Sequence, residues 1–291
     1  MTSSVSVLTL VRGRRTHLVK LIAGLNASTR KPDELVIVYM QADAHSDLPA
    51  TDFPVRAVFV EGTEMPLAGA RNRAAATATG KQLIFLDVDC IPAPTLIERY
   101  AETAGWPGGI RLGEVLYLPA AALDDTPNDG LDFTALDRVG VRHPAKPPIA
   151  LDEIRPTPNH GELWGLSFAI SAADWVRAGG MDERYVGYGG EETDFAARLE
   201  DAGIAMWWVG GARAYHQHHA VHTPPYQHFE AIVRNARLFR ATWGRWCMDY
   251  WLGQFAERGL IDWDADTITI LRHPDAADVA ASHMPPETLF S

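Results

Sequence analysis

The sequence predicts an α/β fold in which a mixed, mostly parallel sheet is flanked by helices, with a helical extension at the carboxyl terminus. Three patterns favour this class. Residues 5–39 have the order strand, helix, strand, which is typical of a βαβ unit. The apolar run at 83–86 has no alternating polar face, as expected of a strand buried on both sides. Residues 226–255 carry apolar and aromatic residues at helical spacing.

The composition limits the kinds of partner. With 291 residues, 47% of them hydrophobic, the chain can form one large domain or two small ones. The net charge of -11 argues against nucleic acid or an anionic membrane, so an anionic ligand would need a metal or local basic residues. No apolar segment approaches the ~20 residues that span a bilayer, so we expect no transmembrane segment. Cys90 and Cys247 show no metal-ligand spacing, and the amino terminus has no signal-peptide pattern, which favours a cytoplasmic protein.

The first half of the chain alternates strands and helices. The expected elements are strands at 5–11, 34–39, 55–60 and 83–86, a helix from Thr16 to Ala27, and an alanine-rich helix that ends at Gly80. Asp43 follows the second strand, where an acid can accept from a base or a ribose group, or is a polar loop residue. Arg71 lies in the first turn of the alanine-rich helix, where cations oppose the helix dipole. A bound phosphate would offset that cost, although a surface arginine pair fits equally well.

The second half is less regular. Residues 106–160 are rich in Pro, Gly and Asp, and only Val115 to Leu118 resembles a strand, so we expect loops on the acceptor side. A strand follows at 163–170, in which Gly165 allows the close approach of another backbone or a sugar. Further expected elements are a helix opened by Ser171, a helix from 191 to about 203, a strand at 205–209 and a loosely ordered tail over the last ~20 residues.

Two carboxylates follow the strand at 83–86. Asp87 and Asp89 lie one residue apart at the carboxyl end of the predicted sheet, where ligands bind in open α/β folds. In an extended segment both side chains would point the same way and could face one divalent ion. A solvated acidic turn would have the same sequence, so the pair needs support from the rest of the chain.

That support comes from two later segments. Four histidines at 216, 218, 219 and 222 follow the last predicted strand, and imidazole together with carboxylate suits manganese or another first-row divalent cation. A loop with three glycines and two tyrosines leads into a helix whose first turn carries Glu191, Glu192 and Asp194. Acids are ordinary at a helix start because they complement the dipole, so these alone do not indicate catalysis.

Taken in order, Asp87-Val-Asp89, Gly187-Tyr-Gly-Gly-Glu-Glu-Thr-Asp194 and Tyr215-His216-Gln-His218 resemble the motifs of GT-A-fold nucleotide-sugar glycosyltransferases. The similarity covers about residues 4–222. The first half resembles the large family 2 type, and residues 163–219 resemble the carboxyl-terminal domain of β-galactosyltransferases and their polypeptide N-acetylgalactosaminyltransferase relatives.

The resemblance implies a Rossmann-like GT-A domain over residues 1–223. Its nucleotide-binding half would be 1–90 and its acceptor and catalytic half 91–223. Residues 224–291 would form a helical extension and tail packed on it.

The resemblance also implies roles at the metal. Asp89 is the expected direct ligand, Asp87 the ribose or metal-water partner, and Val88 between them belongs to the donor-binding motif. His216 is the expected second ligand to Mn²⁺ or Mg²⁺, with His218 as the alternative.

Further implied roles concern the sugars. In inverting members the final acid of the Gly-Gly-Glu-Asp type motif is the catalytic base; here that position is Glu192, one methylene longer, and Glu191 could share or take the role. Tyr188 stands where many galactosyltransferases have Trp and keeps a stacking surface. The expected sugar contacts are Trp164, Tyr188, Gly189, Gly190 and Glu191, and the expected nucleotide contacts are Arg12, Asp43 and Arg71.

The implied activity is metal-dependent, inverting transfer of galactose or N-acetylgalactosamine from a UDP-sugar to a hydroxyl of a glycan, lipid-linked or small-molecule acceptor. A GDP-mannose donor or a retaining mechanism is an alternative within the class. A nucleotidyltransferase is a second alternative, for which Arg12-Gly13-Arg14-Arg15 is a faint version of the basic glycine-rich loop. A non-catalytic sugar- or metal-binding module is a third.

Overall fold

The main sheet has eight strands in the order β3-β2-β1-β4-β10-β6-β11-β9, in a computed structural model that describes residues 3–62, 64–103, 108–124 and 130–290. The strands are β1 Val5–Val11, β2 Glu34–Tyr39, β3 Val55–Phe59, β4 Gln82–Leu86, β6 Ile110–Leu112, β9 Ile154–Thr157, β10 Ser167–Ser171 and β11 Met206–Val209. The first four strands are mutually parallel, whereas β10 is antiparallel to β4 and β6. This arrangement agrees with the predicted mixed, mostly parallel sheet.

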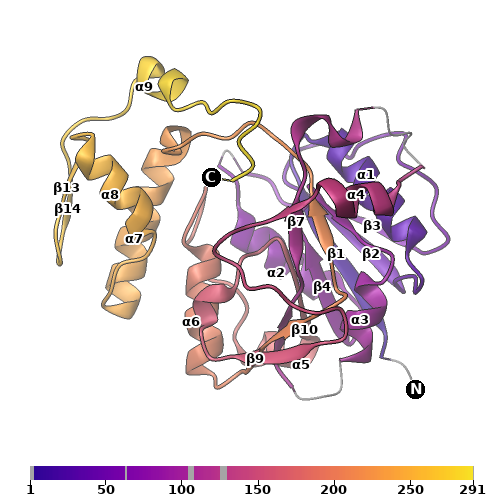
Figure 1. Ribbon diagram of the computed structural model, residues 1–291. Helices are drawn as coiled ribbons and strands as arrows, with labels where there is room; N and C mark the ends of the chain where they lie inside the picture. The colour runs from indigo at the N-terminus through magenta and orange to yellow at the C-terminus, as the bar shows by residue number, and fades with distance from the viewer. Residues whose placement is uncertain (1–2, 63, 104–107, 125–129, 291) are drawn as a thin grey trace.

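Helices cover both faces of this sheet (Figure 1). They are α1 Arg15–Ala27, α2 Leu67–Thr77, α3 Leu96–Glu102, α5 Ala172–Arg177 and α6 Glu191–Asp201. A further helix, α4 Phe133–Val139, packs instead on the second sheet described below, where Leu136 joins the apolar cluster of Ile91 and Leu116. Val7 of β1 belongs to the apolar cluster that contains Leu21 of α1, and its neighbour Leu8 belongs to the cluster that contains Phe195 of α6. Because adjacent side chains of a strand point to opposite faces, a strand covered on both sides must be apolar throughout.

A second sheet, β5-β12-β7-β8, starts directly after the acidic turn that follows β4. Its strands are β5 Cys90–Pro92, β7 Val115–Tyr117, β8 Val141–Arg142 and β12 Ala214–His216. β12 runs antiparallel to β5 with His216 opposite Cys90, and the Gln217 amide donates to the Asp89 carbonyl at 2.7 Å. This pairing brings the histidine segment beside the acidic turn.

Several elements differ from the sequence prediction. The strand expected at 163–170 begins only at Ser167, because residues 165 and 166 form a turn. The alanine-rich helix ends at Thr77 rather than at Gly80. The irregular stretch at 106–160 contains β6, β7, α4, β8 and β9, although its residues 106–107 and 125–129 lie outside the described part of the chain. These strands are too short to show a sequence period.

In the carboxyl-terminal extension, the helical stretch predicted at 226–255 forms two helices. They are α7 Phe229–Trp243 and α8 Asp249–Glu257, followed by the hairpin β13 Ile261–Trp263 and β14 Ile268–Ile270 and by α9 Ala276–Ala281. Gly244, with φ of 70°, ends α7 in the left-handed conformation that favours glycine. α9 lies within the tail that was expected to be loosely ordered, and Asp275 and Asp278 form a capping box at its start.

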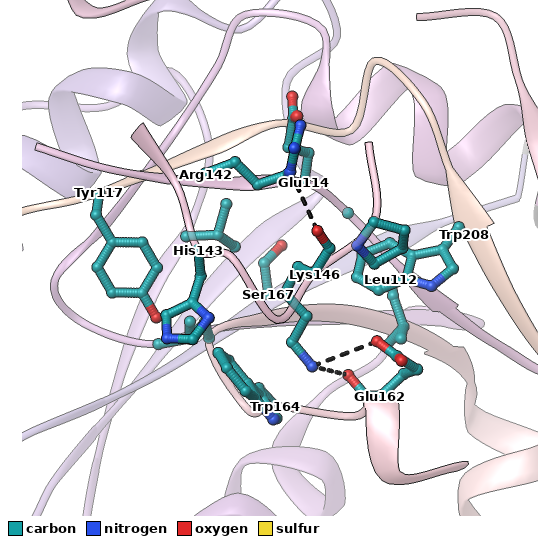
Figure 2. A pocket seen from close by; sticks show the side chains of 14 residues that line it. Leu112, Glu114, Tyr117, Arg142, His143, Lys146, Glu162, Trp164, Ser167 and Trp208 are labelled. Carbon is teal, nitrogen blue, oxygen red and sulfur yellow. Dashed lines mark hydrogen bonds and ion pairs between the residues drawn. The ribbon is translucent and has the colours of Figure 1, made fainter. Parts of the chain in front are cut away.

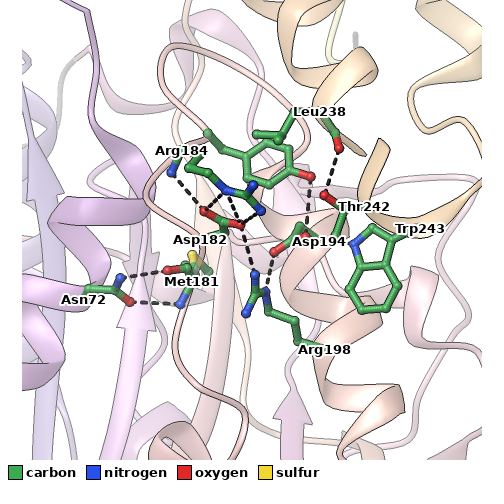
Figure 3. Close-up of polar contacts among 10 residues, drawn as sticks. Asn72, Met181, Asp182, Arg184, Asp194, Arg198, Leu238, Thr242 and Trp243 are labelled. Atoms are coloured by element: carbon green, nitrogen blue, oxygen red, sulfur yellow. Dashed lines mark hydrogen bonds and ion pairs between the residues drawn. The ribbon is translucent and has the colours of Figure 1, made fainter. Parts of the chain in front are cut away.

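The extension contacts the main domain at α6 and at the glycine-rich loop before it, where Asn235 of α7 donates to the Gly189 carbonyl at 2.7 Å. The Asp194 carboxylate of α6 is fully buried and accepts from Trp243 Nε1 of α7 at 2.8 Å and from Arg198 Nε at 2.6 Å (Figure 3). On the other side of the loop, Asn72 of α2 exchanges two hydrogen bonds, of 2.8 and 2.9 Å, with the backbone of Met181 (Figure 3). The loop is therefore fixed from both sides. Within the described residues, every helix is too short or too polar to cross a membrane.

Candidate active site

The acidic pair lies in a turn rather than in an extended segment. The Cys90 amide donates to the Asp87 carbonyl at 2.8 Å, which closes the turn between β4 and β5. The two carboxylates therefore meet different partners, and the geometry expected of an extended segment does not apply. Asp87 reaches Arg71, whereas Asp89 reaches the histidines.

Asp89, His216 and His219 form a group that could hold a metal ion, with one ligand atom of each within 4.8 Å of the others. Asp89 Oδ1 lies 3.7 Å from His216 Nε2, and Asp89 Oδ2 lies 3.8 Å from His219 Nε2. Ligands that share an ion at bonds of about 2.1 Å lie roughly 3 to 3.5 Å apart, so the group needs only a small contraction. Among the described residues, these are the side chains that come together in a group of three close enough to hold one metal ion. Asp87 and His218 do not belong to this group.

The electrostatics of this group suit a divalent cation. Burial lowers the pKa of His216 to about 4, against the opposing attraction of Asp89, so its imidazole is neutral at pH 7 and keeps a lone pair for a metal. The buried Asp89 has a lowered pKa because His216, Arg14 and His219 together outweigh the cost of burial. The guanidinium of Arg14 already rests on the Asp89 carboxylate, which shows that positive charge is accommodated there. One carboxylate and two imidazoles fit Mn²⁺ or a similar first-row ion.

Arg71 lies at the centre of the second half of the site. Its side chain is only 3% exposed, and its NH2 group lies 2.7 Å from Glu192 Oε1 and 3.2 Å from Asp87 Oδ1. Its NH1 group lies 3.6 Å from Glu191 Oε1. Arg71 thus connects the acidic turn after β4 with the start of α6.

Glu192 is held by a second contact, from the turn at Gly165. The Gly165 amide donates to Glu192 Oε2 at 2.8 Å. A Cβ atom on residue 165 would lie 1.8 Å from Glu192 Oε1, so glycine is required for this approach. The sequence predicted the close approach of another backbone or a sugar at Gly165, and the group that the structure places there is the Glu192 carboxylate. The Glu192 side chain remains 27% exposed, and its carboxylate has further lone pairs that can accept from a substrate hydroxyl.

Glu191, which is buried, and Asp87, whose side chain is 32% exposed, bind protons more tightly than usual. Burial, reinforced by the neighbouring Glu192, raises the pKa of Glu191 to about 7. Burial also raises the pKa of Asp87 to about 7, although Arg71 opposes the shift. Only 7% of the Glu191 side chain is exposed, so it lies behind Glu192 rather than beside an open cleft.

The twin glycines position the start of α6 against the carboxyl-terminal helices. Gly189 and Gly190 both have φ of 90°, and a Cβ on residue 189 would lie 2.7 Å from the sulfur of Met248. The Tyr188 ring stacks on His228 at 4.5 Å and is tilted against Trp251 at 5.5 Å. The predicted sugar contact Tyr188 therefore packs on the extension.

The two remaining nucleotide candidates lie on exposed loops at the carboxyl ends of β1 and β2. Arg12 and Asp43 are both exposed. Gln41 links their loops, because its side chain accepts from the Gly13 amide and donates to the Asp43 carbonyl, each at 2.6 Å. The structure thus brings these two loops together at one edge of the sheet.

A pocket lies beside the metal group, because Tyr117, which lines it, has its ring 4.7 Å from that of His216 (Figure 2). Trp164 forms one wall, and Lys146 Nζ sits 3.6 Å from the centre of its ring. Lys146 also donates to the Glu162 carbonyl at 2.8 Å, and its pKa is lowered to about 8, chiefly by burial. His143 packs against the edge of Trp164 at 4.7 Å.

Sequence reasoning missed several of these residues. His219 was part of the histidine run but not among the chosen ligands, and Arg14 was part of the basic loop after the first strand. His143 and Lys146 lie in the irregular stretch at 106–160, and Glu162 lies just beyond it. The run of histidines was the only signal that could have identified His219.

Two family models match the chain. The model described as "Glycosyl transferase family 2" matches residues 6–114, and the model described as "N-terminal domain of galactosyltransferase" matches residues 145–223. The chain is 28% identical over 165 residues to "Validoxylamine A glucosyltransferase" from Streptomyces hygroscopicus subsp. jinggangensis (strain 5008) and to the protein of the same name from S. hygroscopicus subsp. limoneus. Each match covers 52% of this chain and 39% or 36% of the relative, so the chain spans less than half of their length.

Solved structures share the fold at low sequence identity. "Crystal structure of GalNAc-T7 with UDP, GalNAc and Mn2+" matches 75% of this chain and 44% of its own, with a TM-score of 0.54 and 18% identity. "Crystal structure of S. aureus TarS 1-349" matches 81% of this chain and 65% of its own, with a TM-score of 0.53 and 13% identity.

Proposed function

We propose that this chain, a GT-A-fold glycosyltransferase with a family 2-like first half and a galactosyltransferase-like second half, moves a sugar from a UDP-sugar to an acceptor hydroxyl with inversion at the anomeric carbon. The proposal includes a divalent cation, Mn²⁺ or Mg²⁺. One observation carries it: Arg71 NH2 lies between Asp87 Oδ1 of the donor-side motif and Glu192 Oε1, the candidate base.

The residues that would hold the metal are Asp89, His216 and His219. A divalent ion bound there would stabilise the negative charge that develops on the leaving nucleoside diphosphate. For Asp87, whose carboxylate contacts Arg71 and is outside this group, the proposed role is that of partner to the ribose or to a metal-bound water. The loops of Arg12 and Asp43 would contact the nucleotide.

Glu192 is the residue proposed to take the proton from the acceptor hydroxyl. It is partly exposed, whereas Glu191 is buried behind it. Arg71 and the Gly165 amide each hold one of its carboxylate oxygens and so fix the orientation of the group. Such preorganisation matters because a general base must lie within hydrogen-bond reach of the proton that it removes.

For the donor sugar, we propose a hexose. Galactose and N-acetylgalactosamine follow from the galactosyltransferase-like half, and glucose is added because the matched Streptomyces proteins are named glucosyltransferases. A retaining outcome and a GDP-mannose donor are the alternatives within the class. The anomeric configuration of the product, read by NMR, distinguishes inversion from retention.

A thermal-shift screen tests the donor and the metal together. UDP with Mn²⁺ is expected to raise the melting temperature, and UDP or Mn²⁺ alone is expected to raise it less, because each ligand adds binding energy only to the folded state. Stabilisation by GDP rather than UDP would indicate a GDP-sugar donor in place of the proposed UDP-sugar. Equal stabilisation by UDP with and without metal would contradict the metal dependence.

Glu192→Gln tests catalysis. The variant is expected to lose about 10²- to 10⁴-fold in transfer rate while its UDP and Mn²⁺ binding stays intact. Glu200→Gln, on the exposed surface of the same helix, is the matched control. Binding of sugar nucleotide without turnover in both wild type and Glu192→Gln would favour a binding module, and nucleotide transfer to a sugar phosphate would favour a nucleotidyltransferase.

A further inference from the structure

The last described residues of the chain run back from α9 toward the main domain (Figure 1). His283 pairs with His222 in an antiparallel bridge. The Thr223 amide donates to the Ser282 carbonyl at 2.8 Å, and the Met284 amide donates to the Val221 carbonyl at 2.9 Å. The tail is thereby fastened to the segment that directly follows the histidines of the metal group.

Beyond Met284 the tail is held by side-chain rings. The Phe290 ring lies 5.0 Å from that of Tyr117 and 4.7 Å from that of His143, in edge contacts with interplanar angles of 75° and 73°. Between residues 285 and 290, the hydrogen bond found is internal, from the Thr288 amide to the Pro285 carbonyl at 2.9 Å. Edge contacts between half-exposed rings are individually weak, so this end of the tail is easily released.

The rings under Phe290 connect the metal group to the pocket. Tyr117 lies 4.7 Å from the ring of His216, and His143 lies 4.7 Å from the ring of Trp164. Tyr117, His143 and Trp164 all line the pocket, and the Lys146 and Glu162 pair supplies polar groups beside them (Figure 2). Aromatic walls with a few fixed polar groups are the usual make-up of a small-molecule site.

We propose that Tyr117, His143 and Trp164 form the platform on which a sugar ring of the acceptor binds, and that Phe290 covers this platform until the acceptor displaces it. The inference rests on the proposed function, since it names the acceptor as a saccharide and locates its subsite. A phenyl ring is a flat apolar disc, similar in size to the apolar face of a pyranose, so both groups can pack on the same aromatic surface.

The test measures the binding of small saccharides to the full chain. The probes are the methyl β-glycosides of galactose, glucose and N-acetylgalactosamine, titrated by saturation-transfer NMR with and without UDP and Mn²⁺. Phe290→Ala is expected to bind at least one probe about 5- to 100-fold more tightly than wild type, since two ring contacts no longer compete. Leu289→Ala, at the neighbouring half-buried apolar residue, is the matched control and is expected to match wild type.

The platform itself is tested by adding Trp164→Ala to Phe290→Ala, which is expected to abolish the gain. Unchanged or weaker binding in Phe290→Ala would overturn the inference, because Phe290 would then be absent from the subsite or part of its wall. The inference would also be overturned if the double variant kept the tighter binding of Phe290→Ala. It would be overturned as well if neither Phe290→Ala nor Leu289→Ala bound any probe. Failure of the proposed function is seen separately, as the absence of a UDP-dependent thermal shift and of UDP release in wild type.

Discussion

Replacing Glu191 by Gln should stabilise the protein at neutral and alkaline pH and leave it nearly unchanged in acid. Glu191 has the geometry of a buried acid rather than of a base that contacts solvent, since its side chain is 7% exposed and its nearest cation, Arg71, lies 3.6 Å away and is shared with two other carboxylates. Gln has almost the same volume and carries no charge, so it removes the charge without opening a cavity.

The magnitude follows from the pKa of Glu191, which burial raises from 4.5 to about 7. An acid whose folded pKa is raised stabilises the folded state below its unfolded pKa, and this contribution is lost as pH rises from about 4.5 to 7. The difference corresponds to roughly 3 kcal/mol at pH 8. Because Gln does not titrate, the stability advantage of the variant should grow by about 2–3 kcal/mol between pH 5 and pH 8.

The assay is urea unfolding of wild type and Glu191→Gln at several pH values in a chelating buffer, with Glu200→Gln as the control for loss of an exposed acid. An advantage that is constant with pH, or a variant less stable than wild type at pH 8, would refute the electrostatic reasoning. Transfer activity should stay within about tenfold of wild type, because Glu192 is the proposed base. If Glu191→Gln loses activity while Glu192→Gln keeps it, the base is Glu191.

Two further substitutions examine the geometry of the site. His219→Ala should weaken Mn²⁺ binding about tenfold or more, measured by isothermal titration, whereas His218→Ala should leave it unchanged, since the Nε2 atom of His219 lies 3.8 Å from Asp89 Oδ2. The opposite result would restore His218, the alternative ligand expected from the sequence. Gly165→Ala should cost about 10²-fold in transfer rate, because its Cβ would displace the Glu192 carboxylate by 1 Å or more. Circular dichroism and UDP binding should be unaffected, and full activity in this variant would show that the Gly165 contact does not position Glu192.

The fold was predictable because its evidence is local. The βαβ start, the doubly buried strands and the order of three motifs are all read from neighbouring residues, and the predicted GT-A-fold glycosyltransferase is confirmed by the two family matches and by the shared fold. The cap of α5 was also local, as Ser171 accepts from the Asp174 amide at 2.9 Å. Short strands such as β6 and β8 were missed because two or three residues carry no period.

The site was only partly predictable because its details depend on contacts between distant segments. Asp87 turns away from the metal group because the chain reverses at 87–90, and this reversal depends on pairing between β5 and β12. The sequence placed Arg71 near the start of a helix. Its contact with the Glu192 carboxylate could not be predicted, because that contact depends on the approach of α6. No periodicity links Phe290 with Tyr117, so no sequence pattern could place the tail beside the pocket.

Charge explains why donor binding should depend on metal. The carboxylates gathered at the site are Asp87, Asp89, Glu162, Glu191 and Glu192, and the cations paired with them are Arg14, Arg71 and Lys146. The acids outnumber these cations, and a nucleoside diphosphate would add further negative charge to a chain whose net charge is already -11. Two of the acids reduce the excess by holding protons near neutral pH. A divalent ion beside Asp89 would supply two positive charges at the point proposed for the pyrophosphate, so the affinity for UDP should fall when the metal is removed and should fall further as pH rises above about 7.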